Sequence, residues 1–241
     1  MAFIRAILYY LTISLALCLV GVPYLLIRGG LFGQWIQCMP ICIPFFEGVF
    51  KIFGIKLNVV GKENIPPEGN FVLVANHQSF LDINVLWPSV SITSFIAKGE
   101  LWKIPIFGWV LNRIGCIPVD KNPRKNANMG KLIVEHLKKG HIISVFPEGH
   151  RSSDGRMLNF QNGIFRMAKE NKFNILPVTL IDTGKRLYKS KTALVPGTVT
   201  VVIHPLVKPQ DYENKTIVEF RDEVRSTIES AMPYAQKETL P

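Results

Sequence analysis

Acidic residues are scarce in this chain of 241 residues. Asp and Glu number 18 against 28 Lys and Arg, which gives a formal net charge of +10. Such an excess favours an anionic partner, such as a membrane surface or an anionic substrate. Nucleic acid is the competing partner, but the basic residues are scattered and no nucleic-acid-binding motif occurs. We therefore expect no nucleic acid to be bound.

Cysteine is scarce too, and the sequence has no C-x-x-C pair. Its four cysteines are Cys18, Cys38, Cys42 and Cys116. Cys38 and Cys42 could share one face of a helix, but no His or acidic residue accompanies them at the spacing of metal ligands. We interpret all four as reduced, partly buried small side chains. Reduced thiols are typical of a domain on the cytoplasmic side of a membrane.

Charge is almost missing from the first 50 residues, where only Arg5, Arg28 and Glu47 carry it. Between the two arginines, residues 6–27 form an uncharged run of 22 residues. As a helix this run would be about 33 Å long, enough to cross the hydrocarbon core of a bilayer. A cleavable signal peptide would have a shorter apolar region that ends in small residues. A second apolar stretch, residues 35–54, is interrupted by prolines and charges and is a weaker candidate.

Two arrangements of this apolar leader remain open. One is a single membrane span, and the other is a helical hairpin that lies in one leaflet with the following domain against the headgroups. A buried helix of a soluble domain is a third, and the missing polar face argues against it. We assign membrane-associating helices to residues 1–55 and an α/β domain to residues 56–241. We expect the inner (cytoplasmic) membrane, with that domain facing the cytoplasm.

The rest of the chain alternates short apolar runs with helical patterns, without an internal repeat. This alternation predicts an α/β domain with a mostly parallel central sheet flanked by helices. Residues 126–139 have helical periodicity, and Gly140 after them suits a helix C-terminus. The expected strands are 58–61, 71–75, 93–97, 115–119, 142–146, 175–180 and 197–203. The other expected helical segments are a short helix after His77, an amphipathic piece over 98–111, and helices at 163–169 and 217–232.

Three motifs of common catalytic sites are missing: G-x-S-x-G, H-E-x-x-H and G-x-x-x-x-G-K-[ST] do not occur. Ionisable residues follow two of the apolar runs, in residues 76–82 and residues 146–152. Ligands of open α/β sheets bind at the carboxyl ends of the strands. These two segments are therefore the candidate site.

His77 is the candidate general base, because an imidazole accepts and releases protons near neutral pH. Asp82 could orient it, but five residues span about 500° of an ideal helix, so the two side chains would point about 140° apart. They can meet only if His77 lies in the loop before a helix and Asp82 in its first turn. Ser79-x-x-Asp82 also matches a capping box, a structural role that is compatible with the first. With no nucleophilic motif present, we expect a hydroxyl group of the substrate to be the nucleophile.

Other residues offer groups that bind anions and hydroxyls. Arg151 has a planar fork that suits a phosphate, and Glu148 could accept hydrogen bonds from substrate hydroxyls. The alternative for these two is an ion pair that stiffens the turn. Lys121 and Arg124 follow the expected strand at 115–119 and could clamp a phosphate. The alternative for them is an ordinary solvated loop.

Together these segments resemble a known family. His77-x4-Asp82, residues 117–124, residues 146–152 and residues 175–178 resemble, in order, the four sequence blocks of the glycerolipid acyltransferases. Residues 97–109 resemble the stretch that these enzymes carry before the second block. The compact size and the apolar leader are similar to those of the 1-acylglycerol-3-phosphate acyltransferase branch.

The resemblance implies transfer of a fatty acyl group from acyl-CoA or acyl carrier protein to the 2-hydroxyl of lysophosphatidic acid. Phosphatidic acid would be the product, and neither a metal nor a cofactor would take part. His77 and Asp82 would then be catalytic, and Glu148 and Gly149 would bind the substrate. The expected ligands of the acceptor phosphate are Arg124, Arg151, Lys103 and Lys121.

One position departs from the family pattern, because His150 stands where the third block usually has Thr. This difference leaves the acceptor preference and the pH profile open. The first alternative function is acyl transfer by the same fold to another acceptor, such as glycerol-3-phosphate or another lysophospholipid. The second is a non-catalytic lipid-binding membrane protein.

Overall fold

The computed structural model describes residues 1–30, 39–120, 122–187 and 193–238. Within them, seven strands form one sheet in the order β1-β7-β6-β2-β5-β3-β4. Neighbouring strands are parallel except for the antiparallel pair β6–β7. This confirms the expected mostly parallel sheet. The strands are β1 Ile55–Val60, β2 Phe71–Ala75, β3 Thr93–Lys98, β4 Ile117–Val119, β5 Ile142–Val145, β6 Asn174–Ile181 and β7 Gly197–Ile203.

The sequence pattern of each strand reflects its position in the sheet. β2 lies in the middle, and all five of its residues are buried, because helices cover both faces of the sheet. Its side chains alternate between two cores: Phe71 and Leu73 belong to one, and Val72 and Val74 to the other. β1 lies at one edge, and its residues alternate between buried or half-buried and exposed.

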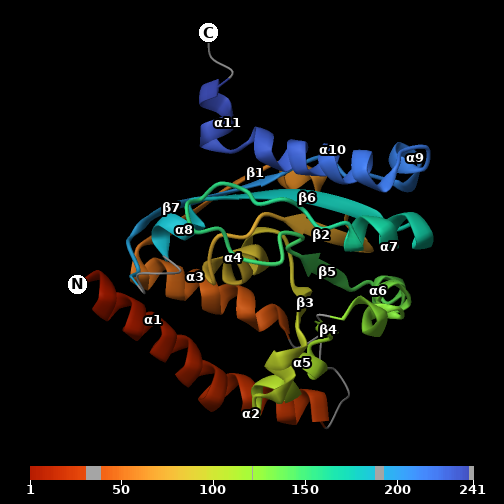
Figure 1. Ribbon diagram of the computed structural model, residues 1–241. Coiled ribbons are helices and arrows are strands. Elements are labelled where there is room, and N and C mark those ends of the chain that lie inside the picture. Colours follow the sequence, from red (N-terminus) through yellow and green to blue (C-terminus); the bar gives the residue numbers. More distant parts are fainter. Residues whose placement is uncertain (31–38, 121, 188–192, 239–241) are drawn as a thin grey trace.

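Helices cover the two faces of the sheet (Figure 1). α3 (Cys42–Phe53), α4 (Leu81–Ser89) and α5 (Phe107–Arg113) pack into the first core. α6 (Met129–Lys138), α7 (Gly163–Asn171) and α10 (Ile217–Ser230) pack into the second. The short helices are η3 Met39–Ile41, η4 Lys62–Asn64, η5 Gly99–Lys103, η6 Pro123–Asn126, α8 Thr183–Arg186, α9 Pro209–Tyr212 and α11 Pro233–Glu238.

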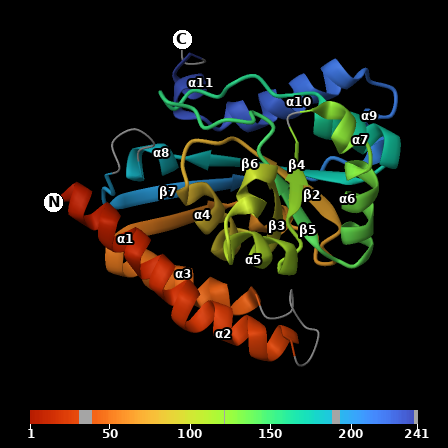
Figure 2. The same cartoon turned by 60° about the horizontal axis from the view of Figure 1, so that its bottom comes forward.

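The apolar leader forms a long helical stretch that lies beside α3 (Figure 2). Its parts are α1 Ala2–Ala16, η1 Leu17–Gly21, α2 Val22–Leu25 and η2 Leu26–Gly30. It is a candidate membrane span over Ala2–Gly29, with a mean hydropathy of 2.1 in its most apolar window, and none of that window is buried. This stretch and α3 form the expected N-terminal pair of helices, and residues 31–38 between them lie outside the described residues.

The start of α1 is bound to the α/β domain. The buried Tyr9 hydroxyl accepts a hydrogen bond from Asn84 Nδ2 of α4 at 2.7 Å. The backbone oxygen of Ala2 accepts one from the Leu194 N–H at 3.0 Å, just before β7. α3 then returns to the domain at β1. Both ends of the described leader therefore lie against the sheet domain.

The described cysteines Cys18, Cys42 and Cys116 are all free thiols. Cys116 is buried and Cys42 is partly buried, as expected. Cys18 is exposed on the leader, contrary to the expectation that it would be partly buried. Cys38 lies outside the described residues.

Candidate active site

The two candidate segments begin at the same edge of the sheet. β2 and β5 are parallel neighbours, and Val74 pairs with Val145. Residues 76–82 and residues 146–152 therefore leave the sheet side by side. Asn76 fixes the first segment to β6 as well, because its side chain exchanges two hydrogen bonds with the backbone of Leu180, at 2.7 and 2.9 Å.

The geometric condition on His77 and Asp82 is met. His77 lies in the loop before α4, and Asp82 is the second residue of that helix. His77 Nδ1 and Asp82 Oδ2 are 2.7 Å apart. The Asp82 side chain is 0% exposed and that of His77 is 18% exposed. The carboxylate is thus fully buried, while part of the imidazole remains accessible to solvent.

One oxygen of Asp82 also organises the start of α4. Oδ2 accepts the backbone N–H groups of Gln78 and Ser79 at 2.7 and 2.8 Å. The bond from the Ser79 N–H to Asp82 is one half of the predicted capping box. The other half is missing, because Ser79 Oγ accepts the N–H of Leu81, one residue before Asp82, and α4 begins at Leu81. Because the carboxylate is an acceptor, Nδ1 of His77 carries the proton and Nε2 presents its lone pair.

The second segment holds the backbone of His77 on both sides. Glu148 Oε1 accepts the His77 N–H at 2.8 Å, and the His77 oxygen accepts the Ser152 N–H at 2.8 Å. The other oxygen of Glu148 accepts the N–H of Leu158, also at 2.8 Å. Burial raises the pKa of the Glu148 carboxyl to about 7, although these two backbone hydrogen bonds favour the charged form. Glu148 thus positions the candidate base, and a contact with substrate stays a prediction.

Phe146 forms one wall of the site. Its ring stacks on the His77 imidazole with 4.2 Å between ring centroids and 15° between planes, and Phe95 is parallel to Phe146 at 6.5 Å. The sequence pattern predicted Phe146 at the end of a strand and indicated no role for it. The available signal was an aromatic residue directly before the Pro-Glu-Gly turn.

Arg151 lies between the His77 loop and the leader. Its guanidinium carbon is 3.9 Å from the centre of the Phe80 ring. Its charge also acts on the hydroxyl of Tyr10 in α1. Gly149, two residues earlier, has a φ of +72°, so any other residue in this turn would be strained. His150 is exposed.

The other expected phosphate ligands lie farther along the sheet. Arg124 is exposed in η6, after β4, which is three strands from β2, or about 14 Å at the usual strand spacing. Lys103 is exposed at the end of η5, and its charge acts on Asp120. Lys121 lies outside the described residues. Lys98, for which the sequence indicated no role, is exposed at the end of β3, the strand between β5 and β4.

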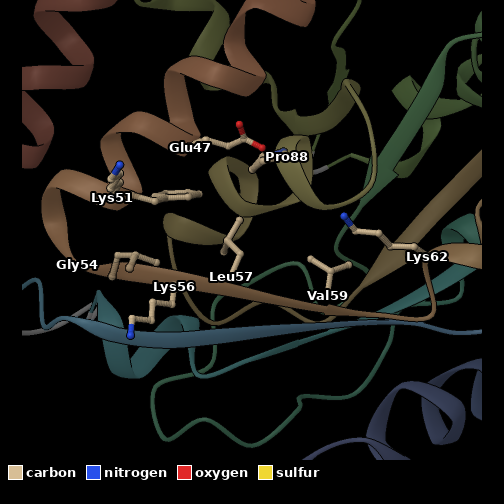
Figure 3. A pocket seen from close by; sticks show the side chains of 10 residues that line it. Glu47, Lys51, Gly54, Lys56, Leu57, Val59, Lys62 and Pro88 are labelled. Atoms are coloured by element: carbon tan, nitrogen blue, oxygen red, sulfur yellow. The ribbon is translucent and has the colours of Figure 1, made fainter.

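Among the described residues, no group of three or more His, Cys, Asp or Glu side chains could hold a metal ion, so the expected absence of a metal stays a prediction. A cavity of about 420 Å³ lies between α3, β1 and α4, with Lys51 and Lys62 at its two ends (Figure 3). It contains none of the predicted site residues.

Known proteins resemble this chain over the same region. A family model described as Acyltransferase matches residues 56–181. A chloroplastic 1-acyl-sn-glycerol-3-phosphate acyltransferase of Arabidopsis thaliana is 40% identical over 62% of this chain and 43% of its own length. The enzyme of that name from Saccharomyces cerevisiae is 32% identical over 91% of this chain and 71% of its own length.

The crystal structure of the 1-acyl-sn-glycerophosphate acyltransferase PlsC of Thermotoga maritima is similar with a TM-score of 0.82 and 26% identity. The likeness covers 100% of this chain and 97% of that one. The chain spans about half the length of the plant and algal relatives that it matches. The matched segment includes His77, Asp82 and Glu148, and the chain belongs to the acyltransferase family.

Proposed function

We propose that this protein is a 1-acyl-sn-glycerol-3-phosphate acyltransferase. It transfers a fatty acyl group from acyl-CoA or acyl carrier protein to the 2-hydroxyl of lysophosphatidic acid and produces phosphatidic acid for phospholipid synthesis. The observation that carries the reaction is the 2.7 Å hydrogen bond between His77 and Asp82, which leaves Nε2 as a base. The names of the relatives support the choice of acceptor.

The acceptor hydroxyl is the nucleophile in this mechanism. In the described parts of the chain, no Ser, Thr or Cys side chain hydrogen-bonds the His77 ring. Nε2 takes the proton of the acceptor hydroxyl while its oxygen attacks the thioester carbonyl. The new C–O bond forms, the C–S bond breaks, and the imidazolium returns the proton to the leaving sulfur, which departs as a free thiol. The Asp82 carboxylate stabilises the imidazolium between these steps.

Arg151 is the first ligand that we assign to the acceptor phosphate. It belongs to the segment that holds the backbone of His77, and the Phe80 ring supports its guanidinium. A planar guanidinium binds a phosphate through two parallel hydrogen bonds. We assign Arg124 and Lys103 to a second anion-binding group near β4, for phosphate oxygens of the acceptor or of the acyl carrier. Lys121 stays an expected phosphate ligand outside the described residues.

We also propose that the leader is a hairpin in one leaflet of the inner membrane, with the sheet domain on the cytoplasmic side. A single span would separate Ala2 from the domain by the thickness of the bilayer. The hydrogen bonds of Ala2 with Leu194 and of Tyr9 with Asn84 argue for the hairpin. The net charge of +10 suits the anionic cytoplasmic surface.

Thiol release tests the function directly. The purified chain would be given acyl-CoA or acylated carrier protein with a panel of lysolipid acceptors. We expect rapid thiol release with lysophosphatidic acid and slow release with glycerol-3-phosphate or uncharged lysolipids. Preference for another acceptor would correct the substrate, and lysolipid binding without any thioester cleavage would show a non-catalytic lipid-binding protein.

A further inference from the structure

A short loop between η5 and α5 exposes large apolar side chains. In this loop, residues 104–107, here called the apolar tip, Ile104 is 49% exposed, Ile106 is 61% exposed and Phe107 is 37% exposed. Single exposed apolar residues are ordinary, but three within four residues form a patch. A patch of this kind at a loop tip indicates contact with something other than water.

The backbone of the apolar tip is strained. Ile106 has φ of 64° and ψ of −51°, and Phe107 donates its N–H to the Pro105 oxygen at 2.6 Å. These values define a γ-turn of the strained kind, which is especially unfavourable for a β-branched residue. The turn is nonetheless firmly built, because Gly108 donates to Ile104 at 2.9 Å and a Cβ on Gly108 would be 2.3 Å from the Trp102 oxygen. The fold thus keeps Ile106 outside at an energetic cost.

The apolar tip is continuous with the leader. Val22 and Leu26 of the leader face Ile106 and Trp109 across an apolar groove of about 300 Å³. Figures 1 and 2 both place α5 beside α2. Leu26 is itself exposed, as is Ile27 next to it. The tip and the leader therefore form one apolar surface, although about 80 residues separate them in the sequence.

Basic residues border this surface. Lys103 directly precedes the tip, Arg28 lies in η2, and Arg113 ends α5 with its guanidinium 5.7 Å from the centre of the Trp109 ring. All three are exposed, and the acidic residue of the same η5 turn is Glu100. An apolar surface with a basic border is complementary to a leaflet of anionic phospholipid: acyl chains meet the apolar part and phosphates meet the cations.

We propose that the apolar tip inserts into the same leaflet as the leader, and that a phospholipid acyl chain fills the groove between them. The partner is the anionic lipid leaflet itself. This inference rests on the membrane association in the proposed function. It adds a second point of attachment, within the sheet domain, which fixes how that domain is tilted on the membrane.

Vesicle binding of the full chain tests the proposal. Partition would be measured on vesicles of phosphatidylcholine and phosphatidylglycerol in equal parts. Ile106→Asn keeps a residue that tolerates positive φ but removes the apolar side chain. Leu132→Asn is the matched control, because Leu132 is 41% exposed on α6, which covers the opposite face of the sheet. We expect Ile106→Asn to weaken partition about tenfold and Leu132→Asn to leave it unchanged.

A second variant separates a loss of membrane contact from a loss of folding stability. Ile106→Gly removes the side chain and relieves the strained turn, so its thermal unfolding midpoint should equal or exceed that of the wild type while partition falls equally. Unchanged partition for both Ile106 variants would overturn the proposal while leaving the membrane association intact. Failure of the wild type to bind vesicles would refute the association itself. The acyl-transfer proposal is judged separately, by thiol release.

Discussion

The backbone N–H of His77 donates a hydrogen bond to Glu148 Oε1 at 2.8 Å, so the candidate base and the turn after β5 are joined directly. Glu148 is almost fully buried, and its second oxygen holds Leu158. A change at Glu148 should therefore disturb the position of His77 before it disturbs the binding of substrate.

Glu148→Gln should lower kcat about 10- to 100-fold and change the acceptor KM little. The amide can accept one of the two backbone N–H groups, and the other loses its partner at a cost of about 1–3 kcal/mol. Steady-state thiol release gives both constants, with Glu135→Gln on the exposed side of α6 as the control. A rise in acceptor KM with kcat unchanged would show that Glu148 binds the acceptor, as the sequence predicted.

The raised pKa of Glu148 predicts a pH dependence of stability. The folded state binds this proton more tightly than the unfolded state, because the pKa rises from 4.5 to about 7 on folding. The free energy of unfolding should therefore fall as pH rises from about 4.5 to about 7, by at most about 3 kcal/mol from this group. Glu148→Gln lacks this titration, so urea unfolding in detergent should show a wild-type advantage that shrinks with rising pH. A constant difference across this range would contradict the raised pKa.

Asp82→Asn should lower kcat by about 10³-fold or more and leave the acceptor KM nearly unchanged. The amide can still cap α4, but it neither fixes the imidazole tautomer nor stabilises the imidazolium. Asp211→Asn is a matched control, since Asp211 accepts the Lys208 N–H at 2.7 Å in the first turn of α9. Similar losses in both variants would mean that Asp82 acts only as a helix cap.

Arg151→Ala should raise the KM for lysophosphatidic acid about 10- to 100-fold, because a charged hydrogen-bonding partner of the phosphate is lost. Arg156→Ala is the control, because its guanidinium lies 5.6 Å from the centre of the Tyr234 ring and not over Phe80. The KM for the thioester should not change in either variant. A response of the thioester KM alone would assign Arg151 to the acyl donor.

Structural elements whose bounds depend on residues adjacent in the sequence were predicted well. The bounds of β2 and β7 equal the predicted runs, 71–75 and 197–203, because turn residues border each apolar run. Helix geometry set the condition under which Asp82 could meet His77, a first-turn position, and the structure meets it. α6 begins at Met129, three residues later than predicted, because Asn122 and Pro123 start a separate 3₁₀ turn there.

Relationships across the sheet could not be predicted. Strand order depends on how distant segments pack, so nothing in the sequence indicated that β7 would lie antiparallel beside β6. The two backbone partners of Glu148 are 71 and 10 residues away, which leaves no periodic pattern to detect. The stacking of Phe146 on His77 likewise requires that β2 and β5 be known as neighbours.

The most direct test of the central claim is thiol release from acyl-CoA by wild type and His77→Ala, with lysophosphatidic acid in vesicles as acceptor. His150→Ala controls for loss of an imidazole from the same edge of the sheet, since His150 is exposed and we give it no catalytic role. We predict that His77→Ala abolishes turnover while vesicle binding persists, and that His150→Ala retains most activity. Substantial acyl transfer by a folded His77→Ala protein would contradict the assignment of His77 as the base.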